Sequence, residues 1–344
     1  MSQLEKEILQ QPEIVKYFLA SQASNISFIC DQIRSKFKYV VIAARGTSDN
    51  AARYAQYLFG AHNKLQVALA TPSLFTFYNT YPNLSDALVI GISQSGRSPD
   101  IISVLEAGRK SGCATLSITN DPDSPLARNS DHVIPISAGV EKAVAATKTY
   151  TSSLTALALF SSILSGNKNH LSQLASLPEL MEQTIQFALP ELFKVQRYRY
   201  INRCTVLGRG YNYATAFEIA LKIKELTGVI AEAYSTADFR HGPIATVSRG
   251  SPVLIVAPSG KLEKDVASIA FQLKNVGAEL ITISDVPRVL SSAMVKFQTP
   301  KTIPEWLSPI PYVIPGQLFA LQLTREMGLP EDQPAGLQKV TETY

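Results

Sequence analysis

The chain has 344 residues, enough for about two or three domains of ordinary size. Hydrophobic residues make up 46% and charged residues 17%, so the chain can bury a large core and is not globally disordered. Its net charge of +4 is too small and too dispersed for a nucleic-acid partner. The three cysteines lie far apart, no apolar stretch has membrane-spanning length, and no signal peptide is apparent, so we expect a cytoplasmic protein without a membrane partner.

The predicted elements begin with a helical segment and continue as alternating strands and helices. Three strand-like runs each end in a landmark residue: Arg45, Ser95 and Asp121. Three later runs end in matching residues: Arg209, Ser259 and Asp285. Every landmark recurs at one offset, which is 209 − 45 = 164 for the first pair. A constant offset for three landmarks indicates a duplication.

Each copy alternates β-branched runs with helical stretches, such as 50–58 in the first copy and 214–226 in the second. This pattern predicts an α/β fold of two tandem domains, each a doubly wound, mostly parallel sheet flanked by helices. A proline-rich passage at 304–315 leads to a last predicted helix over 316–327, and the polar tail is either frayed or held. The predicted organisation is a helical segment 1–36, a first domain 37–166, a helical connector 167–198, a second domain 199–330 and a tail 331–344.

The loop at 93–98 joins the second strand to a helix and is rich in hydroxyl groups. Ser98 suits the N-cap and Pro99 the first helical position. A phosphate here would meet amide groups, the positive helix end and hydroxyls, including those of the turn at 47–48. The alternative is a capped turn that binds nothing. We favour phosphate because only the first copy has hydroxyls in both loops. A dinucleotide site is not expected, because neither a GxGxxG nor a P-loop motif occurs.

A charged stripe marks the predicted helix in the second copy. Glu218, Lys222 and Glu225 are spaced i, i+4 and i+7, with apolar positions on both sides. Such charges point into a cleft or an interface, or else they form a structural salt bridge. His241 in a Gly-Pro loop is a candidate acid or base, or else a structural histidine. Lys339 lies in the tail, where a lysine is usually solvated.

At these residues the chain resembles the tandem sugar isomerase (SIS) domain family. It is similar to the isomerase half of glutamine–fructose-6-phosphate amidotransferase and to stand-alone glucosamine-6-phosphate deaminases and phosphosugar isomerases. The resemblance covers essentially the whole chain. The matching stretches are 6–12, 45–48, 93–96, 145–148, 221–225, 231–234, 240–243, 332–334 and 339–341.

The resemblance implies a phosphosugar site that needs no metal or redox cofactor. It implies a phosphate site formed by five loop residues: Ser48, Ser93, Gln94, Ser95 and Ser98. It implies sugar contacts at two further positions: Thr47 and Val144. Finally, it implies four catalytic positions: Glu225 as the proton-transfer base, Lys222 as the charge beside it, His241 as a ring-opening group supplied by the neighbouring subunit of a homodimer, and Lys339 as a Schiff-base lysine.

Three departures from the synthase pattern shape the expected activity. The chain opens with Met1-Ser2 and not with a glutaminase cysteine, so glutamine is not expected as the nitrogen donor. Arg97-Ser98 stands where the synthase loop typically has Glu-Thr, and Ala335 stands where the synthase tail usually has arginine. We expect conversion of glucosamine 6-phosphate to fructose 6-phosphate and ammonia. The alternatives are a phosphosugar isomerase, an ammonia-dependent synthase, and a non-catalytic sugar-phosphate sensor.

Overall fold

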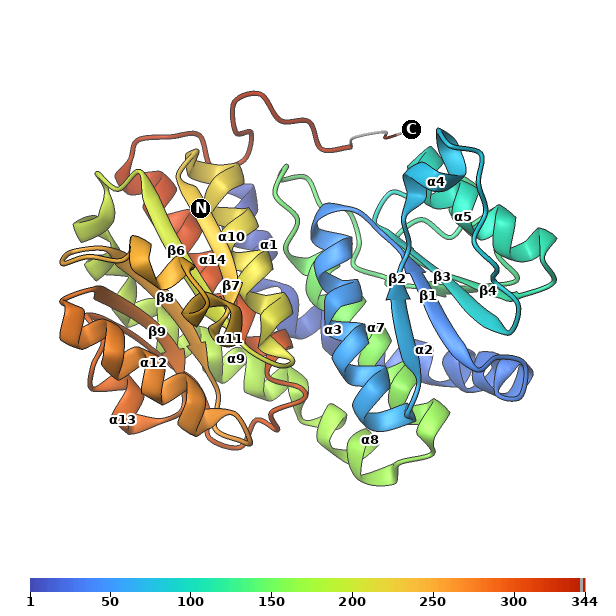
Figure 1. The fold of residues 1–344 in the computed structure, drawn as a ribbon, viewed down its shortest axis with the longest axis horizontal. Helices are drawn as coiled ribbons and strands as arrows, with labels where there is room; N and C mark the ends of the chain where they lie inside the picture. The colour runs from blue at the N-terminus through green and yellow to red at the C-terminus, as the bar shows by residue number, and fades with distance from the viewer. Residues whose placement is uncertain (341–342, 344) are drawn as a thin grey trace. The chain divides into compact units, whose positions relative to one another are not determined.

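The computed structural model describes residues 1–340 and 343, which form two compact units. The first unit comprises Glu13–Glu141, Lys148–Ala175 and the tail from Gln338 onwards. The second unit comprises Met1–Pro12, Lys142–Thr147 and Ser176–Leu337. Each unit contains one five-stranded sheet flanked by helices (Figure 1). Neither unit is therefore one continuous stretch of chain.

The sheet of the first unit has the strand order β2-β1-β3-β4-β5, and all its strand pairs are parallel. Because β1 pairs with β2 on one side and with β3 on the other, right-handed connections place α3 and α5 on opposite faces. The elements are α2 (Gln11–Ile33), β1 (Tyr39–Ala43), α3 (Gly46–Asn63), β2 (Gln66–Leu69), α4 (Pro72–Thr76), β3 (Ala87–Ser93), α5 (Pro99–Lys110), β4 (Ala114–Thr119), α6 (Pro125–Arg128), β5 (His132–Pro135), α7 (Lys148–Ser165) and α8 (Lys168–Ala175).

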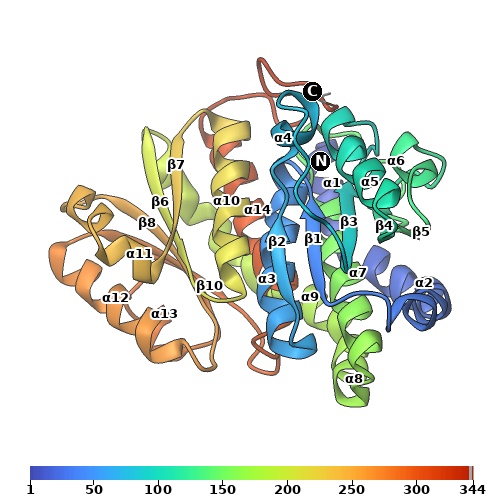
Figure 2. The ribbon, with the colours of Figure 1, turned by 45° about the vertical axis from the view of Figure 1, so that its right-hand side comes forward.

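The central strands of this sheet are apolar because helices cover both faces. Every residue of β3 is buried. Ile101, Val104 and Leu105 of α5 pack into the core on one face, where α4 also lies. Helices α3 and α7 pack on each other and cover the other face (Figures 1 and 2). Within residues 1–340 and 343, no helix combines the length and apolarity needed to cross a bilayer.

The second unit repeats this plan, with the strand order β7-β6-β8-β9-β10 and parallel pairing throughout. Helices α10 and α14 pack together on one face, while α12 and α13 cover the other (Figure 1). The predicted α/β fold with two doubly wound sheets is confirmed. The elements are α1 (Gln3–Leu9), α9 (Leu177–Ala188), the 3-10 helix η1 (Leu189–Tyr198), β6 (Arg203–Gly208), α10 (Asn212–Thr227), β7 (Ile230–Ser235), α11 (Thr236–Arg240), the 3-10 helix η2 (Pro243–Thr246), β8 (Pro252–Ala257), α12 (Glu263–Val276), β9 (Glu279–Ser284), α13 (Pro287–Leu290), β10 (Val295–Gln298) and α14 (Pro309–Glu326).

The last helix begins earlier than the sequence predicted. We expected it over 316–327, but α14 starts at Pro309 and contains Pro315. Pro309 and Pro311 lie in the first turn, where no intrahelical N–H bond is needed. Pro315 does remove one helical hydrogen bond. Packing outweighs that loss, because α14 is buried along almost its whole length against α10, α9 and η1.

Candidate functional site

The candidate site in the first unit lies where the strand order changes direction. In the register of β1 and β3, Ala43 is opposite Gly91, so both strands end at the same edge of the sheet. The turn at 47–48 follows β1 and the loop at 93–98 follows β3. Ligands of open parallel sheets bind in the crevice at such a switch point. The fold thus brings the two predicted hydroxyl-bearing loops side by side.

The loop at 93–98 has a fixed backbone. Gly96 has φ +62°, and a Cβ there would collide with the side chain of Ser124. The Gly96 N–H donates to Ser93 Oγ at 3.1 Å. The carbonyl of Gln94 accepts the N–H of Asn120, which follows β4, at 3.2 Å. A ligand would therefore meet a preorganised loop.

The hydroxyls of this loop are suited to a ligand. Ser98 occupies the predicted N-cap position of α5, but its side chain makes no capping hydrogen bond. Ser95 Oγ accepts only a long bond from the Arg97 N–H, 3.4 Å, among the residues that the structure describes. Ser48, Gln94, Ser95 and Ser98 are all half-buried. A serine hydroxyl that is not used to cap its own helix or turn can donate a hydrogen bond to an anion.

An ion pair ties the two loops together. Arg45, the N-cap residue of α3, has its Nε 2.7 Å from Oδ2 of Asp100, a fully buried residue in the first turn of α5. The Asp100 N–H donates to the carbonyl of Thr343 at 3.2 Å. The end of the chain therefore contacts the helix that follows the serine loop.

The tail lysine belongs to the same unit. Lys339 Nζ lies 2.8 Å from Oε2 of Glu141, a buried acid in the connection between β5 and α7. Sequence reasoning did not single out Glu141. Two features of the sequence could have indicated Glu141. It is the one acid among the mostly apolar residues of 138–140 and 143–146. It also recurs as a second acid, Glu305, at the repeat offset of 305 − 141 = 164.

The predicted charged stripe lies on α10 in the second unit. Lys222 Nζ is 2.5 Å from Glu225 Oε2 and 3.4 Å from Glu218 Oε1. Lys222 and Glu218 are buried, whereas the Glu225 side chain keeps 24% of its surface exposed. Both predicted interpretations therefore apply: Lys222 forms salt bridges with both acids, and the carboxylate of Glu225 is also partly exposed.

Glu225 lines a cavity of about 420 Å³ at the C-terminal end of α10. The opposite wall is apolar and comes from the segment after α14, including Leu329, Pro334 and Leu337. A carboxylate with a buried ammonium behind it and apolar groups in front is a suitable arrangement for a general base.

The remaining predicted residues have different surroundings in the second unit. His241 directly follows α11, is exposed, and its ring has no hydrogen-bond partner among residues 1–340 and 343. The Val144 N–H donates to the Asp332 carbonyl at 3.0 Å, so a sugar contact would have to use the Val144 carbonyl. The neighbouring amides of Lys142 and Ala143 donate to the buried carboxylate of Glu7.

The predicted site residues thus fall into two groups. The first unit holds the five loop residues, Thr47 and Lys339, and the second holds Glu225, Lys222, His241 and Val144. The part of the chain that the structure describes contains no group of three or more His, Cys, Asp or Glu side chains that could hold a metal ion.

The switch point of the second unit is satisfied by its own carboxylates. Asp285 accepts the N–H and Oγ–H of Ser259 at 2.7 and 2.5 Å. Glu305 accepts the Lys261 N–H at 2.9 Å.

A third carboxylate, that of Asp265, pairs with Arg209 at 2.6 Å. Burial opposes the charge of Asp265, but bonds from Arg209 and Thr236 and the charge of Arg240 outweigh it and lower the pKa of this carboxyl.

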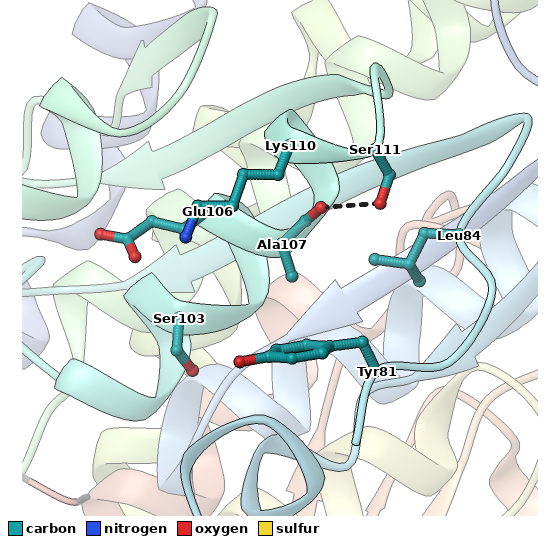
Figure 3. Close-up of a pocket in the computed structure, with 7 residues that line it drawn as sticks. All are labelled: Tyr81, Leu84, Ser103, Glu106, Ala107, Lys110 and Ser111. Atoms are coloured by element: carbon teal, nitrogen blue, oxygen red, sulfur yellow. Dashed lines mark hydrogen bonds between the residues drawn. The ribbon is translucent and has the colours of Figure 1, made fainter. Parts of the chain in front are cut away.

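A separate cavity of about 310 Å³ lies on the outer side of α5. Figure 3 shows it between Tyr81 and the α5 side chains Ser103, Glu106 and Lys110. None of the predicted site residues lines it. We therefore do not connect this cavity with the candidate site.

The two parallel, doubly wound sheets, each flanked by helices, define an α/β protein of two tandem domains. The family model for the SIS domain matches residues 33–162 and 198–326, and the chain belongs to this family. It is 30% identical to the glutamine–fructose-6-phosphate aminotransferase (isomerizing) of Brucella abortus over 356 residues, covering 98% of the chain and 58% of that protein. The chain thus spans just over half the length of this curated relative.

Solved structures give the same picture. A candidate phosphosugar isomerase from Silicibacter pomeroyi superposes with a TM-score of 0.87 at 30% identity, covering 96% of this chain and all of that one. Glucosamine-6-phosphate deaminase from Thermotoga maritima has a TM-score of 0.79 at 22% identity, with 99% and 100% covered, and shows a shared fold. The relatives described above are named as enzymes that act on sugar phosphates, and this chain is an enzyme of the SIS family.

Proposed function

We propose that the chain isomerises and deaminates an amino-sugar 6-phosphate, converting glucosamine 6-phosphate to fructose 6-phosphate and ammonia. The observation that carries this proposal is the hydroxyl-lined switch point of the first unit. In the second unit Asp285 and Glu305 bind the equivalent loop, whereas their counterparts in the first unit, Asp121 and Glu141, bind Asp123 and Lys339. Such a site suits a phosphate group. Glu225, which lines a cavity of the second unit, suits proton transfer.

In this proposal the serine loop and the turn at 47–48 hold the phosphate. Hydrogen bonds to a charged group contribute about 1.5–3 kcal/mol each, so four or five would hold a phosphate without a lysine. His241 opens the sugar ring, and Glu225 moves a proton from C2 to C1 of the open chain. The resulting C2 imine is hydrolysed directly or passed to Lys339, and ammonia leaves.

We also propose a cytoplasmic homodimer in which His241 acts in the partner's site. The exposed His241 ring supports this assignment, because it has no hydrogen-bond partner within the described residues of its own chain. Three buried, free cysteines support a reducing compartment: Cys30, Cys113 and Cys204.

The test is a coupled assay of ammonia release from a panel of hexosamine 6-phosphates. Replacing Glu225→Gln should lower kcat by about 10²- to 10⁴-fold and leave substrate binding in place. Glu232→Gln, an exposed acid on β7 of the same unit, is the matched control and should keep full activity.

Other outcomes separate the alternatives. Synthesis of amino sugar from fructose 6-phosphate and ammonia, without measurable release, would assign the chain as a synthase. Binding of sugar phosphate without turnover by the unmodified protein would assign it as a sensor. Full activity of the Glu225→Gln variant would remove Glu225 as the base.

A further inference from the structure

The tail lysine, Lys339, forms an ion pair with the buried carboxylate of Glu141, which is not one of the predicted site residues. Glu141 has a fully buried side chain, and Lys339 Nζ lies 2.8 Å from its Oε2. Thr149, in the first turn of α7, also binds this carboxylate: its N–H donates to Oε1 at 3.2 Å and its hydroxyl to Oε2 at 2.8 Å. Glu141 is therefore rigidly placed, and Lys339 is anchored to it.

A second contact fixes the tail close to Lys339 in sequence. The carbonyl of Thr343 accepts the N–H of Asp100 at the start of α5. Both anchors, Glu141 and Asp100, lie in the first unit, which also holds the serine loop. The lysine thus has a defined resting position on the unit that would bind the phosphate.

The ion pair has a chemical consequence for Lys339. A buried carboxylate needs a counter-charge, and the ammonium of Lys339 supplies it at 2.8 Å. An ammonium ion has no lone pair and cannot attack carbon. Lys339 must therefore lose a proton before it reacts, and the Glu141 carboxylate lies at hydrogen-bond distance to receive it.

We propose that Glu141 is the positioning residue and proton acceptor of Lys339. This inference rests on the proposed function. As the proton moves to Glu141, Nζ forms a bond to C2 of the protonated imine and the bond from C2 to the departing nitrogen breaks. Water then hydrolyses the lysine imine to the ketone and restores the ammonium of Lys339. The proton held by Glu141 leaves with ammonia as ammonium.

The test traps the lysine imine in the intact protein. Fructose 6-phosphate is added with cyanoborohydride, and the reduced adduct on the peptide containing Lys339 is measured by mass spectrometry. Glu141→Gln keeps the size and the Thr149 contacts but neither charge nor basicity, so trapping should slow by about tenfold or more. KM should stay within about threefold, because other residues hold the phosphate.

Thr149→Val is the matched control. It removes a hydroxyl from Glu141 but leaves the carboxylate and Lys339 in place, so trapping should stay within about threefold of the wild type. Equal slowing in both variants would reduce Glu141 to a structural residue and overturn the inference. Trapping at the wild-type rate in Glu141→Gln, or an adduct on another lysine, would overturn it as well.

A measurement on the unmodified protein needs no variant to fold. Trace labelling with an amine reagent in the absence of sugar should modify Lys339 at least about fivefold more slowly than Lys38, whose partner Asp86 is exposed. Equal labelling would contradict the resting ion pair. Trapping requires only a ketose phosphate, so it reports on Lys339 and Glu141 even if ammonia release, the test of the proposed function, fails.

Discussion

The two switch points of this chain share one backbone plan and differ in what binds their loops. In the first unit, the loop after β3 presents hydroxyls that have few partners. In the second unit, the equivalent loop after β8 is bound by Asp285 and Glu305. A carboxylate and a phosphate compete for the same donors. A few acidic residues can thus give two copies of one fold different roles. In one copy the loop donors can bind an external anion, and in the other they bind carboxylates of the same unit.

The connection that follows the last strand of each sheet shows a similar difference between the units. Glu141 lies between β5 and α7, and Glu305 lies between β10 and α14. Glu141 binds a side chain from the tail, whereas Glu305 binds a backbone amide of its own switch point. The acid at this position therefore binds the tail lysine in one copy and the backbone of the switch-point loop in the other.

The strongest way to break this comparison is at the paired glycines of the two loops. In Gly96→Ala, the new Cβ would collide with Ser124 at a positive φ, so at least two loop donors would shift. Sugar-phosphate affinity, measured by calorimetry, should fall by about 100-fold or more. In Gly260→Ala, the Cβ would meet Glu305, and affinity should stay within about threefold. Similar losses of affinity in both variants would contradict the division between the copies.

The paired aspartates give the next largest effect, on stability. Asp285 accepts bonds from Ser259 and from the buried hydroxyl of Tyr312, so Asp285→Ala leaves several donors unpaired. The free energy of unfolding should fall by about 2–4 kcal/mol in urea titrations. Among residues 1–340 and 343, the side chain of its counterpart Asp121 accepts one hydrogen bond, from the exposed Asp123 N–H, so Asp121→Ala should cost about 1 kcal/mol or less. Equal losses would show that Asp285 does not close its loop.

The paired serines sharpen the comparison further. Ser95→Ala should raise KM for the sugar phosphate by about tenfold, because one hydrogen bond to a charged group is lost. Ser259→Ala should leave KM unchanged and lower stability by about 1–2 kcal/mol, because its hydroxyl binds Asp285. Steady-state kinetics and thermal unfolding of both variants check this, and an increased KM for Ser259→Ala would count against a closed second loop.

The smallest expected effect is a difference between the units in how much stability each loses at acidic pH. Burial, and the neighbouring ring of His170, lower the pKa of His62 in the first unit from 6.5 to about 4. The unfolded chain then binds more protons between these values, so stability falls as the pH drops from about 6.5 to 4. The loss should be on the order of 1 kcal/mol, well below the full shift because the ring is only partly buried.

His62→Phe should reduce that pH dependence without affecting the second unit. The remaining part comes from His132 and His170 of the same unit, because burial lowers their pKa values too. Hydrogen exchange at pH 7 and pH 5 reports on the strands of each sheet separately. A matching acid loss in the second sheet, or an unchanged pH dependence in the variant, would refute the assignment to His62.

Local patterns predicted much of this structure because they depend on neighbours in the sequence. The apolar runs at β3 and β8 predicted buried parallel strands, and the constant offset predicted two equal sheets. The order Ser98-Pro99 predicted the start of α5. The start of α14 was missed, because its prolines are tolerated only through packing that the local sequence does not contain.

The sequence by itself determined the two doubly wound sheets, the hydroxyl-bearing loops and the spacing of the acids and lysine on α10. Only the tertiary structure decided which groups satisfy each loop. Lys339 meets Glu141 across 198 positions of the chain, and Ser259 meets Asp285 across 26. Such pairs depend on how strands and connections are brought together in space, and the energy of a buried charge depends on that arrangement and not on adjacent residues.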